Sequence, residues 1–87
     1  MEKKILLVDD ELHMREMLYD LLSRKGYKMF TAPGGGEAVE IVRRENPNLV
    51  LLDIKMHAIN GIEVLKKIRE FNATIKIVML TGIDDVG

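Results

Sequence analysis

The sequence lacks cysteine, which excludes a disulfide framework and any metal site built on thiolates. It has almost no net charge, because 13 basic and 14 acidic residues leave a formal charge of −1. That balance gives no electrostatic argument for a nucleic-acid or anionic-membrane partner. It also lacks an apolar run of transmembrane length, and the acids of residues 9–11 interrupt the stretch that begins at Ile5 before a signal-peptide core is complete. We therefore expect a cytoplasmic protein without a nucleic-acid or membrane partner.

The composition is that of a small globular domain. Of the 87 residues, 47% are hydrophobic and 31% are charged, a balance that argues against disorder. A chain of this length forms one domain at most and buries a small core. We expect residues 1–87 to be a single domain.

Apolar runs alternate with segments of helical periodicity along the chain. The expected strands are residues 5–8, 27–32, 49–52 and 75–80, and the expected helices are residues 11–25, 37–45 and a segment after Gly61. The runs read as strands buried on both faces, and such strands in alternation with helices are typical of a parallel sheet with right-handed crossovers. The sequence therefore predicts an α/β fold of order βαβαβαβ.

Two local patterns carry further expectations. The first helix places five apolar side chains on one stripe, which predicts that they pack as core: Met14, Met17, Leu18, Leu21 and Leu22. After Pro33, three glycines at 34–36 precede the second helix, and we interpret them as a flexible turn rather than an anion-binding loop.

Acidic and hydroxyl side chains follow the apolar runs. Asp9 and Asp10 end the first, Asp53 ends the third and Thr81 ends the fourth. Because the carboxyl ends of parallel strands meet at one edge, the three carboxylates converge if the first and third strands are neighbours. Carboxylates that close raise each other's pKa or require a cation. A single acid would be interpreted as a solvated turn residue, but three with a hydroxyl favour a functional cluster.

The chemistry of such a cluster is that of phosphoryl transfer. Mg²⁺ prefers carboxylate oxygens and commonly accompanies phosphate chemistry. An aspartate beside the ion can act as a nucleophile toward phosphorus and form an acyl phosphate, and the Thr81 hydroxyl is then placed to donate to a phosphoryl oxygen.

The same residues carry a family resemblance. The blocks at 5–11 (ILLVDDE), 51–56 (LLDIKM) with Asn60-Gly61, and 78–81 (VMLT) resemble the signature blocks of the receiver domains of two-component response regulators. The resemblance implies a flavodoxin-like fold. It also implies a phosphoacceptor protein rather than an enzyme, with no chemistry beyond its own phosphorylation and dephosphorylation.

The resemblance assigns roles to individual residues. It implies that Asp53 is the phosphoacceptor and that Thr81 is the switch hydroxyl. It implies that Asp10, Asp53 and the backbone carbonyl of Lys55 bind Mg²⁺ directly, and that Asp9 acts through water. The phosphoryl donor would be a histidine kinase or a phosphotransfer protein.

The sequence departs from the family pattern in two places. His57 stands where the family usually has proline, and we interpret it as an exposed loop residue rather than a metal ligand or pH sensor. The family's last helix, strand and helix have no counterpart in the 87 residues, and neither Lys55 nor Lys76 stands at the position of its fifth-strand lysine. We therefore expect a homodimer that covers the edge of strand 75–80 and the bare sheet face.

Three functional hypotheses follow from these observations. The first is a stand-alone, phosphoryl-accepting receiver without an output domain. The second is an interaction or dimerisation module that has lost switching. The absent lysine favours this hypothesis, and the intact acids argue against it. The third is an excised or engineered fragment of the fold.

Overall fold

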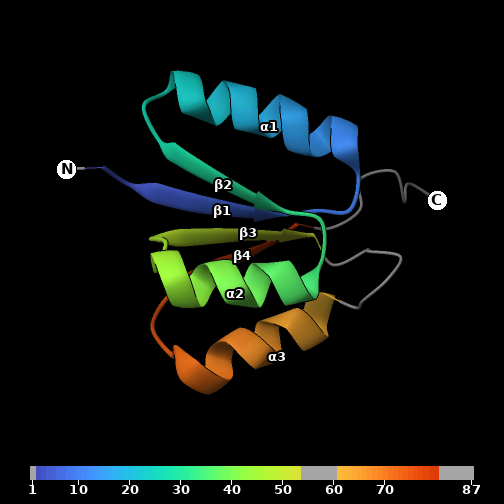
Figure 1. Ribbon diagram of the computed structural model, residues 1–87, viewed down its shortest axis with the longest axis vertical. Helices are drawn as coiled ribbons and strands as arrows, with labels where there is room; N and C mark the ends of the chain where they lie inside the picture. The colour runs from blue at the N-terminus through green and yellow to red at the C-terminus, as the bar shows by residue number, and fades with distance from the viewer. Residues whose placement is uncertain (1, 54–60, 81–87) are drawn as a thin grey trace.

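The computed structural model describes residues 2–53 and 61–80. Within them, strands and helices alternate as the sequence predicts (Figure 1). The elements are β1 (Lys4–Val8), α1 (Leu12–Arg24), β2 (Lys28–Ala32), α2 (Gly35–Glu45), β3 (Leu49–Asp53), α3 (Gly61–Phe71) and β4 (Lys76–Leu80). The expected α/β fold of order βαβαβαβ is therefore confirmed.

The four strands form one parallel sheet in the order β2-β1-β3-β4. The first strand lies in the middle, with Leu6 opposite both Phe30 of β2 and Val50 of β3. β3 is therefore the direct neighbour of β1. The acidic residues at the ends of these two strands can converge only if the strands are neighbours.

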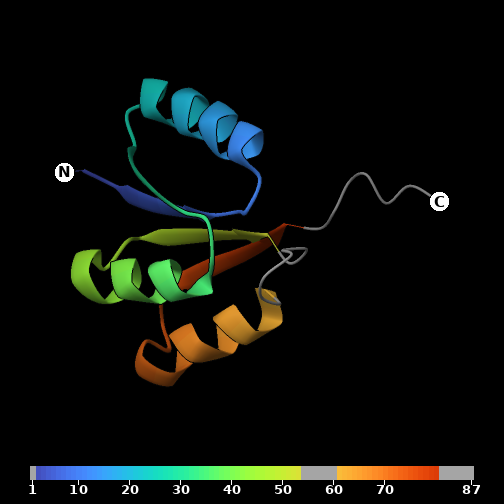
Figure 2. The ribbon, with the colours of Figure 1, turned by 45° about the vertical axis from the view of Figure 1, so that its right-hand side comes forward.

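Helices cover the two faces of the sheet unequally, as Figures 1 and 2 show: α1 lies over one face, and α2 and α3 lie over the other. The face under α2 and α3 holds the larger apolar core. Its buried residues are Leu6, Val8, Ala32, Ala38, Val42, Val50, Leu52, Val64, Ile68 and Ile75. The face under α1 holds a smaller one, in which the buried residues are Ile5, Leu7 and Met29.

Helix α1 buries less of its apolar stripe than the sequence predicts. Leu18 and Leu22 pack against the smaller core, but Met17 and Leu21 are 57% and 49% exposed. The helix contributes no fully buried residue. The prediction that the whole stripe is core was wrong, because a single helix on a sheet face contacts it along a narrow line.

Strand β4 is an edge of the described sheet and pairs only with β3 within it. Its residues alternate between the faces, so Ile77 and Met79 pack against the larger core while Val78 points to the other face and is 45% exposed. The strand is thus covered by helices on one side and open on the other.

The glycine run is not the flexible turn that the sequence predicts. Gly34 is the extended N-cap of α2, while Gly35 and Gly36 lie in its first turn, where Gly35 is buried. Backbone N–H groups in a first turn have no intrahelical acceptor, so the weak helix propensity of glycine costs least there.

None of the described helices has the length and apolar content needed to cross a bilayer.

Candidate metal centre

The site is built from the carboxyl ends of β1 and β3. Asp53 is the last residue of β3, and Asp9 and Asp10 directly follow β1. The register pairs Val8 with Leu52, so the next residue of each strand arrives at the same edge of the sheet. One carboxylate oxygen from each of Asp9, Asp10 and Asp53 lies within 4.8 Å of the others. The structure therefore brings together the three carboxylates that the sequence places at strand ends.

Asp9 is the innermost of the three and is held by its backbone and its side chain. It is 4% exposed, whereas Asp10 and Asp53 are half-buried. Its amide nitrogen donates a 3.1 Å hydrogen bond to the carbonyl of Ala32, and its Oδ1 accepts a 2.9 Å hydrogen bond from the amide of Glu11. These contacts extend the β1–β2 ladder by one residue and begin the turn into α1.

Burial dominates the electrostatics of Asp9. Removal of its carboxylate from water raises its pKa, and the hydrogen bond from Glu11 opposes this by stabilising the charged form. The charge of Asp53, a hydrogen bond between the two carboxyl groups and the charge of Asp10 raise the pKa further. An ionised Asp9 is therefore costly in the folded protein unless a cation compensates it.

The donor set fits a hard divalent cation. Three carboxylate oxygens lie close together, one of them from a buried side chain, and such oxygens are the ligands that Mg²⁺ and Ca²⁺ take in proteins. The positive charge of an ion would offset the desolvation and the mutual repulsion of the acids. Asp9, Asp10 and Asp53 are the described residues that would hold it.

Other predicted site residues are placed differently. Lys55, His57 and Thr81 lie outside the described residues, so their roles remain predictions. Lys76 pairs with Leu49 at the amino end of β4, the opposite end from the acids. This position agrees with the expectation that Lys76 does not stand in for the family's fifth-strand lysine.

Sequence reasoning missed one residue that contacts this site. Arg15, in the first turn of α1, donates from Nη1 to the backbone carbonyl oxygen of Asp9 at 2.8 Å. Its place six residues after Asp9 is a signal that the sequence offers, but the contact depends on how α1 packs against the sheet.

Comparison with known proteins assigns the family. The family model described as response regulator receiver domain matches residues 5–86. The chain belongs to this family, whose members are phosphoacceptor domains of two-component signalling. The resemblance to receiver domains and the expected flavodoxin-like fold are confirmed.

Particular relatives are similar over nearly the whole chain. Sporulation initiation phosphotransferase F of Bacillus subtilis is 39% identical over 82 residues, which is 94% of this chain and 66% of that protein. The chain spans only 35% of several longer transcriptional regulators that it also matches.

Two solved structures are similar in both fold and sequence. The response regulator TrrA of Thermotoga maritima, crystallised with Mg²⁺ and BeF, has a TM-score of 0.85 and 41% identity, covering 97% of this chain and 76% of that one. The complex of histidine kinase ThkA with TrrA matches with a TM-score of 0.84 and 44% identity, covering 92% of this chain and 69% of that one.

Proposed function

We propose that this chain accepts a phosphoryl group on Asp53 in a reaction that depends on Mg²⁺. The observation that carries the proposal is the meeting of the Asp9, Asp10 and Asp53 carboxylates within 4.8 Å at the carboxyl edge of the sheet. The TrrA structure, which is similar to this chain, holds Mg²⁺ and BeF, and this supports a metal-dependent site.

The roles of the residues are those that the family resemblance implies, and the position of Asp53 agrees with its role. Asp53 ends β3 and is half-buried, so its carboxylate can meet a phosphorus atom that arrives from solvent, while the more deeply buried Asp9 is less accessible. A carboxylate oxygen of Asp53 forms the bond to phosphorus, and the donor's bond to phosphorus breaks, its electron pair leaving with the donor. Mg²⁺, when bound, offsets the negative charge on the transferred group. We assign Asp9, Asp10, Asp53 and the Lys55 carbonyl to metal binding, and the Thr81 hydroxyl to the phosphoryl oxygen.

A donor of the histidine kinase or phosphotransfer class fits this chemistry. One similar structure is a complex of a histidine kinase with a response regulator, and one relative is named a phosphotransferase. The donor then supplies the phosphoryl group and this chain carries it, without turning over an outside substrate.

The test uses acetyl phosphate as a small donor. With Mg²⁺, the wild-type protein should gain the mass of one phosphoryl group, and the gain should be absent with EDTA. Asp53→Asn should show no gain. Asp20→Asn removes an acid of α1 whose side chain is 63% exposed and pairs with Arg24, so it should be labelled like the wild type. Labelling of Asp53→Asn at the wild-type rate would reject the proposal.

We further propose that the 87-residue polypeptide forms a homodimer through β4 and the open sheet face. Val78 is 45% exposed at the strand's centre, beside half-buried Leu51 of β3. An apolar edge of this kind is a template for association with a second copy. Sedimentation equilibrium should give a dimer for the wild type and a monomer for Val78→Lys. Ile62→Lys changes an exposed residue of α3 and should leave the dimer intact; a monomeric wild type would reject the proposal.

A further inference from the structure

Arg15 is a cationic side chain that contacts the backbone of the acidic pair, Asp9 and Asp10. Its guanidinium donates to the backbone carbonyl oxygen of Asp9 at 2.8 Å. This hydrogen bond does not use the carboxylate oxygens of Asp9. That carbonyl belongs to the peptide unit that joins Asp9 to Asp10. Because a peptide unit is planar, holding its oxygen also sets the position of the Asp10 Cα.

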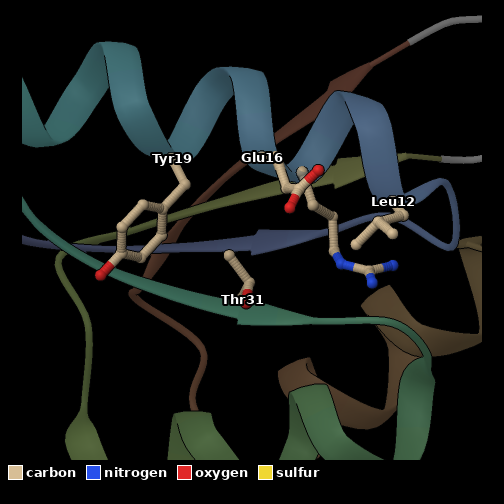
Figure 3. Close-up of a pocket in the computed structure, with 5 residues that line it drawn as sticks. Leu12, Glu16, Tyr19 and Thr31 are labelled. Atoms are coloured by element: carbon tan, nitrogen blue, oxygen red, sulfur yellow. The ribbon is translucent and has the colours of Figure 1, made fainter.

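The guanidinium reaches this carbonyl from a groove between α1 and β2. Leu12, Glu16 and Tyr19 extend from the helix above Thr31 of β2, as Figure 3 shows, and Arg15 also lines the groove. The Arg15 side chain thus borders the groove and has its charged end at the acidic turn.

The carbonyl of Asp9 has few alternatives to this partner. Asp9 is 4% exposed, so a carbonyl that lost its donor would have little access to water. The other contacts described for Asp9 use its amide nitrogen and its carboxylate, which meets the Glu11 amide and the Asp53 carboxyl group. Of these contacts, the one with Arg15 is made at the carbonyl oxygen of the peptide that leads to Asp10.

We infer that Arg15 is a positioning residue for the metal centre: it holds the Asp9–Asp10 peptide so that both carboxylates face Asp53. The inference rests on the proposed function, since it concerns the site that we assign to Mg²⁺. Residues that orient metal ligands typically change metal affinity by about 10–100-fold when they are removed. Arg15 is expected to act in this way without contacting the metal.

The first measurement is the Mg²⁺ dissociation constant, obtained by titration of backbone amide NMR signals. Arg15→Met keeps most of the side chain in the groove and removes the donor, and should raise the dissociation constant about 10-fold or more. Arg15→Lys keeps a cationic donor and should recover most of the loss. Arg24→Met removes a guanidinium that pairs with Asp20 at the far end of α1 and should bind Mg²⁺ like the wild type.

The second measurement is hydrogen exchange of the Asp10 and Glu11 amides in metal-free protein. Arg15→Met should exchange faster at these two positions, while amides in the middle of β1 stay protected. Circular dichroism melting sets a temperature at which every variant is folded, so general unfolding does not account for the result.

The outcomes separate the inference from the proposed function. Unchanged Mg²⁺ affinity in Arg15→Met, with normal binding by the wild type, overturns the inference alone. A wild type that does not bind Mg²⁺ rejects the proposed function, and overturns with it the role of Arg15 in metal binding. The exchange result then decides whether Arg15 orders the acidic turn for some other purpose: unchanged exchange in Arg15→Met overturns that as well.

Discussion

The amide of Glu11 donates a 2.9 Å hydrogen bond to Oδ1 of Asp9. The turn after β1 therefore closes on the side chain of its own first residue, and the carboxylate is held where its burial is nearly complete. The hydrogen bond from Glu11 favours the charged form of Asp9, whereas the burial of Asp9 disfavours it. The consequences for stability can be measured.

Asp9→Asn is expected to stabilise the metal-free protein at neutral pH. Asparagine keeps an oxygen for the Glu11 amide and removes the buried charge. The folded pKa of Asp9 is raised above its ordinary value of 3.8, so between those two values the unfolded chain has lost a proton that the folded protein keeps. Wild-type stability therefore falls as pH rises through this window, and the penalty is complete above it. The advantage of the variant should shrink as pH falls toward 3.8.

Urea unfolding followed by circular dichroism at several pH values checks this prediction. Mg²⁺ should raise the stability of the wild type more than that of Asp9→Asn, because the ion offsets the charge that the variant lacks. A metal-free variant less stable than the wild type at neutral pH would contradict our account of Asp9.

Substitution of Gly26 by alanine should destabilise the protein. Gly26 follows α1 with φ at 99°, and an added Cβ would meet no atom within 4 Å, so backbone strain is the only cost. That cost is about 1–2 kcal/mol. Gly36→Ala is the matched variant, because Gly36 also has open space but lies in α2, and it should gain up to about 1 kcal/mol. Equal thermal stabilities for the two variants would show that the Gly26 backbone adjusts freely.

Ile68→Ala should lose about 2–5 kcal/mol of unfolding free energy. Ile68 is fully buried in the core beneath α3, where truncation leaves a cavity. Ile62, on the same helix, is 42% exposed, and Ile62→Ala should change stability by about 0.5 kcal/mol or less. Chemical denaturation measures both, and similar losses at the two positions would mean that α3 packs by a different face.

Arg69→Met should weaken the connection between α3 and β4. Nη1 of Arg69 donates to the carbonyl of Ile75 at 2.6 Å, at the entry to the edge strand. A lost hydrogen bond from a charged donor costs about 1–3 kcal/mol. Lys67→Met, an exposed position of the same helix, is the control. Exchange of the β4 amides that are protected in the wild type should rise in Arg69→Met alone; protection equal to the wild type would show that the bond does not hold β4 in place.

The element order was predictable because its signals are local. A continuous apolar run such as Ile5 to Val8 and a stripe with a period of 3.6 residues report the environment of a single element. The stripe of α1 was less informative, since Met17 and Leu18 look equivalent in sequence but only Leu18 packs on the sheet. The part of an apolar stripe that is buried depends on the element that packs against the helix. That element is distant in the sequence, so a local pattern does not report it.

Residue types read along the chain were enough to predict carboxylate chemistry at the sheet edge, from acids directly after two apolar strands and from the motif blocks that carry the family resemblance. Three features became visible only in the folded arrangement: β1 and β3 are neighbours, Asp9 is the buried member of the trio, and Arg15 contacts the Asp9 carbonyl. The reason is physical. The residue types that follow a strand are written along the chain, whereas strand order and burial depend on long-range pairing of segments distant in the sequence.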